Sequence, residues 1–372
     1  MGLRAMFREQ TVSRLSRLRR VSYTRLVREQ EPPFANLAYG AAGLAYALLR
    51  AALTLEDDRA LRQAARLLDD ALAASRRRSA FLPARVPPEH CPRTSIFFGL
   101  PGMHFVRALV AHAAGDRRGA SRSVAAFIAG ARRGLDGPLE LYGGLAGVLS
   151  AATVLSEVEP ALPELAALGR TVRDRLLAAA GPGEPWDGLP ANMIAHGRAG
   201  VAAALLQWAA REGSAVPGRL LDALQGLRRR TLAILARSSI PEPRGAYVRG
   251  SFCSGAAGYA LVFVMAHRHT GDERFRTAAV RFGTVARSSS VLGPSACCES
   301  AGACYALAAL ARADPAGRWR RRAEQLAARS LAAPHWRRWR YNLMRGGEGG
   351  LLCLAADFAQ DAPPRFPPFG FF

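Results

Sequence analysis

Apolar runs recur along the chain, and each begins at a pair of glycines three residues apart. Six pairs follow this rule: Gly40/Gly43, Gly99/Gly102, Gly144/Gly147, Gly197/Gly200, Gly255/Gly258 and Gly347/Gly350. A further copy keeps Gly302 but has Glu299 in the first position. Successive copies begin 44 to 59 residues apart, a period typical of proteins built from repeated supersecondary units.

Each repeat is predicted to form two helices. The first is apolar on nearly all sides, as in a helix that is buried all round, whereas the second is rich in Arg and amphipathic, as over residues 57–78 and 218–237. No segment shows a convincing strand pattern. Seven such pairs can form an open solenoid or a closed double ring, and the apolar character of the first helices favours the ring. We therefore predict an all-α toroid of seven inner and seven outer helices over residues 36–372, with all the glycine turns on one face.

Residues 1–35 precede the first repeat and form an Arg-rich segment with helical spacing. Its apolar residues predict an amphipathic helix that either contacts a partner or membrane surface or packs on the ring: Leu3, Phe7, Leu15, Leu18 and Leu26. We treat this segment as separate from the toroid domain.

Composition narrows the possible chemistry. All 51 basic residues are Arg, so the chain lacks the lysine that Walker A motifs, protein kinases and Schiff-base enzymes require. The formal net charge of +22 suits an acidic partner, although a solvated basic surface would explain it as well. Six cysteines in a chain without a secretory segment suit a reduced, cytoplasmic setting, and no stretch is long and apolar enough to span a membrane.

Residues with chemical potential stand just before the glycine pairs. Glu140 precedes the third glycine pair, His196 the fourth and Cys253 the fifth. Cys297 and Cys298 precede Glu299, which takes the place of the first glycine in the sixth repeat. Because a ring brings adjacent turns together, the three cysteines and His196 could meet there. Three thiolates suit Zn²⁺ and leave a fourth position open, as in catalytic zinc sites. The spacing itself matches no standard zinc motif.

The turns around these residues resemble the lanthionine synthetase C family. Three segments carry the likeness, which extends over about residues 36 to 358: Ala195–Gly200, Phe252–Gly258 and Cys297–Gly302. The family fold is an α/α toroid, in agreement with the double ring predicted from the repeats.

The resemblance implies one zinc ion per chain on Cys253, Cys297 and Cys298. Cys298 stands where most members have His, and a minority uses three thiolates. The family's acid/base His corresponds to His196, and its catalytic Asp corresponds to Glu140. The alternative for Glu140 is that it caps the next helix, since acidic residues favour helix starts.

The implied reaction is thioether formation. A peptide Cys thiolate adds to dehydroalanine or dehydrobutyrine, and the α-carbon then takes a proton, which gives lanthionine or methyllanthionine. The substrate would be a dehydrated precursor peptide with an acidic leader, made by a separate dehydratase. Arg198, Arg338 and Arg340 are candidates for binding it, although an ordinary exposed Arg run with Trp anchored in the core is the simpler explanation of residues 336–340. We expect no nucleic-acid partner.

Two other functions remain open. The first is a thiol transferase that adds glutathione to dehydrated peptides. The second is a metal-free toroid that acts as a scaffold for a modifying complex, an alternative raised by Glu299 in the position of the turn glycine. Cys304 and Cys353 lie within apolar helices and are expected in the core. The pair His90 and Cys91 has no further ligands nearby in the sequence.

Overall fold

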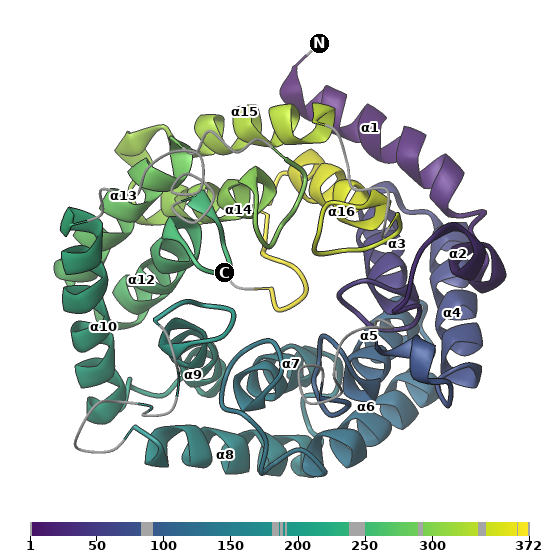
Figure 1. The fold of residues 1–372 in the computed structure, drawn as a ribbon, viewed down its shortest axis with the longest axis horizontal. Helices are drawn as coiled ribbons and strands as arrows, with labels where there is room; N and C mark the ends of the chain where they lie inside the picture. Colours follow the sequence, from purple (N-terminus) through teal and green to yellow (C-terminus); the bar gives the residue numbers. More distant parts are fainter. Residues whose placement is uncertain are drawn as a thin grey trace.

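A computed structural model shows a closed double ring of helices (Figure 1). It describes residues 2–82, 92–180, 186, 189, 192–237, 250–288, 293–333, 340–362 and 364–370. Every regular element in this part of the chain is helical, which confirms the predicted all-α toroid. No helix in the same part combines the length and the apolar character that crossing a membrane requires.

The inner ring consists of the apolar helices. Each begins directly after the first residue of a glycine pair or, in the sixth repeat, after Glu299. Their residues are buried on nearly every side because they face the outer helices, their neighbours and the ring centre (Figure 1). The seven inner helices are α3 (Ala41–Leu55), α5 (Leu100–Ala113), α7 (Leu145–Val158), α9 (Arg198–Glu212), α12 (Ala256–Thr270), α14 (Ser300–Ala313) and α16 (Glu348–Ala359).

The outer ring consists of the amphipathic helices. Asp57, Asp116 and Asp272 cap three of them by accepting backbone N–H bonds of the first turn. The helices that follow an inner helix are α4 (Asp58–Ala73), α6 (Arg117–Arg132), α8 (Pro163–Ala178), α10 (Gly218–Arg237), α13 (Glu273–Arg287) and α15 (Trp319–Ala332). The described residues also form three short helices: α2 (Tyr23–Glu29), η1 (Arg78–Ala80) and η3 (Pro315–Gly317).

The N-terminal helix α1 (Leu3–Leu18) supplies the seventh outer helix. It lies outside α16, and Figure 1 shows it between α15 and the α3–α4 pair. Phe7 is fully buried and its ring centre lies 5.6 Å from that of Phe358. Leu15 and Leu18 are also buried. Of the two alternatives for this segment, the structure shows packing on the ring.

The glycine pairs let the chain fold back closely on each inner helix. A Cβ on Gly147 would lie 2.3 Å from the carbonyl oxygen of Leu141, and one on Gly302 would lie 2.2 Å from that of Ala296. Neither distance is possible for a side chain, so a residue with a Cβ would force the incoming turn away from the helix.

Hydrogen bonds join the seven turns into a circle. The bonding residue stands two places before the first position of the glycine pair, or three places in the case of Met344. Its N–H donates to the carbonyl of the equivalent residue in the neighbouring turn. The chain of donors and acceptors runs through Tyr142, Ala195, Cys253, Cys297, Met344, Ala38 and Phe97. The hydroxyl of Ser95 closes the circle by donating to the Tyr142 carbonyl at 2.8 Å. Consequently residues from distant repeats stand side by side on one face.

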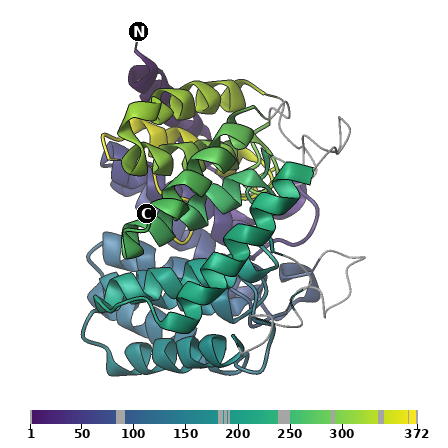
Figure 2. The ribbon, with the colours of Figure 1, turned by 90° about the vertical axis from the view of Figure 1, so that its left-hand side faces the viewer.

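The last described residues lie in the ring centre. Figure 1 shows residues 364–370 inside the inner ring, and Figure 2 shows the double ring from its side. Phe366 stacks on Phe252 with ring centres 3.7 Å apart, and Phe369 meets the edge of Phe97 at 5.3 Å. Since Phe252 and Phe97 belong to turns of the circle, this segment supports the turn face from within the ring.

Candidate metal centre and acid/base pair

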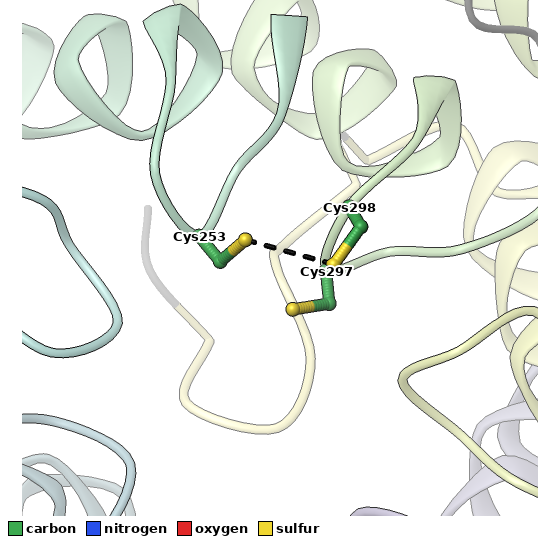
Figure 3. A group of neighbouring side chains, drawn as sticks. All are labelled: Cys253, Cys297 and Cys298. Carbon is green, nitrogen blue, oxygen red and sulfur yellow. Dashed lines mark hydrogen bonds between the residues drawn. The ribbon is translucent and has the colours of Figure 1, made fainter. Parts of the chain in front are cut away.

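Three cysteines converge where the fifth and sixth turns meet (Figure 3). The Sγ atoms of Cys253, Cys297 and Cys298 lie within 4.8 Å of one another, and those of Cys253 and Cys298 are 3.7 Å apart. The backbone N–H of Cys253 donates to the carbonyl of Cys297 at 2.9 Å. The hydrogen-bonded circle therefore sets the register that brings the thiols together.

The pKa values of the three thiols are shifted in opposite directions. Hydrogen bonds from the Cys297 and Cys298 thiols hold the pKa of Cys253 far below its usual range. The same bonds to Cys253 raise the pKa of Cys297 and of Cys298, and burial adds to the effect. A divalent cation would draw the remaining protons from these two thiols and satisfy all three sulfurs.

Hydroxyl groups surround the sulfur of Cys253. Its Sγ lies 3.7 Å from the Ser254 Oγ and 4.0 Å from the Ser251 Oγ, and the two hydroxyls are 3.1 Å apart. On the other side, the Ser295 Oγ accepts the N–H of Cys298 and donates to the carbonyl of Met344. These serines fix the turns that carry the thiols.

An arginine that the sequence analysis did not single out contacts the thiol cluster. The Nη1 of Arg345 donates to the Cys298 Sγ at 3.3 Å, and its guanidinium also bonds the phenolic oxygen of Tyr39. Arg345 is half-buried. Burial lowers its pKa, but the neighbouring Tyr39 phenol and the cysteine thiols outweigh this and raise the pKa above its ordinary value.

His196 and Glu140 form a pair in the turns next to the cysteines. The Nδ1 of His196 lies 3.2 Å from the Glu140 Oε2, and the His196 side chain is 53% exposed. The residue before His196, Ala195, donates its N–H to the carbonyl of Cys253 at 3.1 Å. The structure thus places all five residues that were predicted as zinc ligands or acid/base groups on consecutive turns.

Glu140 also fixes its own turn, at a position that recurs around the ring. Its carboxylate accepts the N–H groups of Tyr142 and Gly143. At the equivalent place four residues before the first position of the glycine pair, Asn36, Ser95, Ser251 and Ser295 accept an N–H in the same way. Glu140 is therefore a turn-capping residue that in addition contacts His196.

Tyr142 lies close to both the His196 ring and the cysteine thiols. Its ring meets the His196 ring edge to face at 5.3 Å. Burial raises the pKa of its phenol well above the ordinary value, and the nearby Cys297 and Cys253 add to this. The hydroxyl is buried and lies beside the Cys297 thiol. Aligning the turns by their glycines would have revealed Tyr142, since it occupies the same register as Cys253 and Cys297.

Glu299 is accommodated without separating the thiols. Its backbone has φ −126° and ψ −167°, close to the values of −129° and −160° at Gly144. Its Oε2 accepts the N–H of Ser295 at 2.9 Å. The carboxylate lies against Gly293, and a Cβ on residue 293 would collide with it. The space that a turn glycine provides in other repeats is therefore provided here by Gly293.

The other candidates that the structure describes have partners outside the thiol cluster. Arg198 donates to the Asn192 Oδ1 at 3.3 Å, and Arg340 pairs with the Glu29 Oε2 at 2.8 Å. Arg338, His90 and Cys91 lie outside the described residues. Cys304 and Cys353 are buried in α14 and α16, as expected of core residues.

A closed α/α toroid with these motifs defines a class of protein, and comparison with known families identifies it. The family profile described as "Lanthionine synthetase C-like protein" matches residues 31–367, and the chain belongs to this family. Among solved structures, a protein described as "Nisin cyclase" is similar, with a TM-score of 0.70 and 12% sequence identity over 92% of this chain and 93% of the other. At this identity the likeness shows the shared fold. No curated protein sequence gives a significant match.

Proposed function

We propose that this protein is a zinc-dependent cyclase that forms (methyl)lanthionine thioether rings in a dehydrated peptide. The observation that carries the proposal is the convergence of Cys253, Cys297 and Cys298 on the turn face, beside His196 and Glu140. Family membership and the toroid fold shared with nisin cyclase support the same activity.

The three cysteines fit zinc by their chemistry. Three thiol sulfurs within 4.8 Å of one another form a soft donor set of the kind that binds Zn²⁺. Three protein ligands leave room for one more, which suits a substrate sulfur. When bound there, Zn²⁺ would keep the substrate thiol deprotonated at neutral pH.

His196 is the group proposed to manage protons. The substrate thiol loses its proton, its sulfur bonds to the β-carbon of the dehydroamino acid, and the α-carbon gains a proton, so that the addition is balanced. With Nδ1–H donating to Glu140, the Nε2 of His196 is the ring atom left to deliver that proton. Glu140 would hold the ring in this orientation.

The substrate assigned to this reaction is a precursor peptide whose Ser and Thr residues have been dehydrated elsewhere. An acidic leader would complement the net charge of +22. Arg198, Arg338 and Arg340 stay proposed contacts to it, although Arg340 would first have to leave Glu29. A reducing cytoplasm would keep the three thiols available.

Zinc content is the first test. Protein purified in metal-clean buffer should carry about one zinc ion per chain, and Cys297→Ala should carry almost none. Cys304→Ala is the matched control because Cys304 is a buried cysteine outside the cluster, and it should keep its zinc. A folded parent protein without zinc would exclude the cyclase and leave the scaffold.

A second experiment separates cyclase from transferase. The zinc-loaded protein is mixed with a dehydrated peptide, either with its own Cys or with Cys replaced by Ala and glutathione added. Loss of free thiol without a mass change in the first mixture indicates a ring. A glutathione adduct in the second mixture alone would instead indicate the transferase.

A further inference from the structure

Arg345 is a half-buried cation whose contacts are unusual for an arginine. Within the described residues its guanidinium forms no ion pair with a carboxylate and instead contacts the Cys298 Sγ at 3.3 Å and the Tyr39 phenol. The N–H of Arg345 donates to the Asn342 Oδ1, which fixes the backbone from which this side chain extends. The guanidinium is thus aimed at one thiol of the cluster.

The position of Arg345 matches a charge problem at the cluster. A zinc ion with two thiolates and a neutral imidazole is electrically neutral, whereas zinc with three thiolates carries one net negative charge. A fourth thiolate, from the substrate, would then meet a site that already repels it. A guanidinium bonded to the Cys298 sulfur offsets one negative charge through a charge-assisted hydrogen bond.

We propose that Arg345 is a positioning residue that supplies the counter-charge for Cys298, so that a three-thiolate site can hold zinc and still accept a substrate thiolate. The hydrogen bond to Tyr39 orients the guanidinium. The inference rests on the proposed zinc-dependent function. It concerns Cys298, the ligand that replaces the histidine of a two-cysteine, one-histidine site.

The test is a double-mutant cycle on zinc affinity, measured on the full chain by competition with a chromophoric chelator. Arg345→Met should raise the zinc Kd of the parent by about tenfold or more, as loss of an outer-shell partner does. In the Cys298→His background the same change should alter Kd by no more than about twofold, because the charge to be offset is gone. Equal effects in both backgrounds would overturn the proposal.

Two further variants guard against a trivial result. Arg345→Lys keeps the charge and should restore most of the affinity lost in Arg345→Met; a Lys variant as weak as the Met variant would overturn the proposal even if Cys298→His binds no zinc. Arg93→Met removes an exposed arginine of the chain and should leave Kd unchanged. A parent that binds no zinc refutes the proposed function itself, whereas a parent that binds zinc regardless of residue 345 refutes only this inference.

Discussion

The Nδ1 of His196 lies 3.2 Å from the Oε2 of Glu140, although the two residues belong to different repeats. The same carboxylate caps its own turn through the N–H groups of Tyr142 and Gly143. A structural and a catalytic role of Glu140 are therefore both supported by geometry, and they can be separated by mutation.

His196→Asn should reduce the rate of ring formation by about 10²- to 10⁴-fold, the usual contribution of a general acid or base. Zinc content should stay as in the parent, because His196 is outside the thiol cluster. The measurement is single-turnover cyclisation of a dehydrated peptide, followed by thiol alkylation and mass spectrometry. A variant that cyclises at the parent rate would remove His196 from the mechanism.

Glu140→Asn should preserve the turn and still slow cyclisation. Asn36 performs the same capping in the first repeat, so the amide can accept the turn N–H while carrying no charge to orient His196. Thermal unfolding should show little change, whereas the cyclisation rate should fall. A rate equal to that of the parent would assign Glu140 to the turn alone.

Most of the architecture could be predicted from the sequence, because each glycine pair marks a close approach of the chain and each apolar run marks a buried inner helix. It did not show that α1 completes the outer ring, since the partner of α16 lies at the opposite end of the chain. The three thiols could be proposed from turn adjacency. Arg345 could not, because its contact with Cys298 depends on the register of the hydrogen-bonded circle and on side-chain direction.

Phe366→Ala should destabilise the protein by about 3–5 kcal/mol, the usual cost of removing a buried Phe side chain. Phe366 is fully buried, stacks on Phe252 and meets the edge of Tyr305 at 5.5 Å. Because Phe252 precedes Cys253, zinc affinity should fall as well. Urea unfolding and chelator competition measure the two effects, and Leu53→Ala, at a side chain that is 54% exposed, is the control that should change neither.

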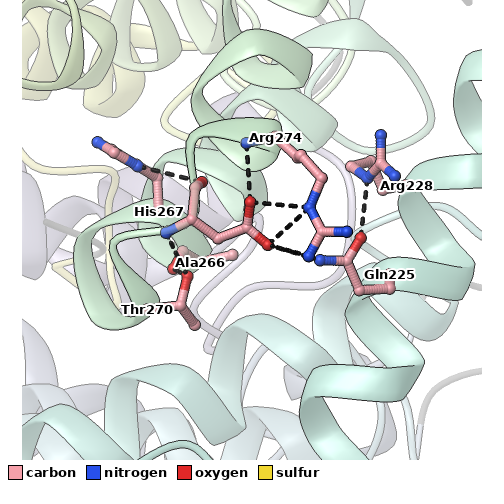
Figure 4. Close-up of polar contacts among 7 residues, drawn as sticks. Gln225, Arg228, Ala266, His267, Thr270 and Arg274 are labelled. Carbon is pink, nitrogen blue, oxygen red and sulfur yellow. Dashed lines mark hydrogen bonds and ion pairs between the residues drawn. The ribbon is translucent and has the colours of Figure 1, made fainter.

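The Asp272 carboxylate joins α10 to α13, so its removal should lower stability more than the loss of a simple cap. Its carboxylate accepts the N–H of Arg274, a side-chain bond from Gln225 of α10 at 2.7 Å and an ion pair with the Arg274 guanidinium (Figure 4). Asp272→Ala should lower the free energy of unfolding by about 1–2 kcal/mol. Asp116→Ala removes a single cap bond and should lower it by about 1 kcal/mol or less.

The contribution of Asp272 should depend on pH. Hydrogen bonds from Arg274 lower the pKa of Asp272 to about 2, from an ordinary value of 3.8. A lowered carboxyl pKa adds stability that is complete above pH 3.8 and is lost as the pH falls toward 2. The difference in unfolding free energy between parent and Asp272→Ala should therefore shrink over this interval, and a difference independent of pH would contradict the ionic interpretation.

Gly302→Ala should disrupt the thiol cluster without touching a thiol. The new Cβ would lie 2.2 Å from the Ala296 carbonyl oxygen and 2.8 Å from the Phe252 Cβ, so the segment that carries Cys297 must move away from the Cys253 turn. Gly218→Ala is the matched control, because a Cβ there meets nothing within 4 Å and should leave stability unchanged or slightly higher. The Gly302 variant should lose both stability and zinc, while the Gly218 variant keeps its zinc. If Gly302→Ala bound zinc with the parent's affinity, close packing of this turn would not be what holds the three sulfurs together.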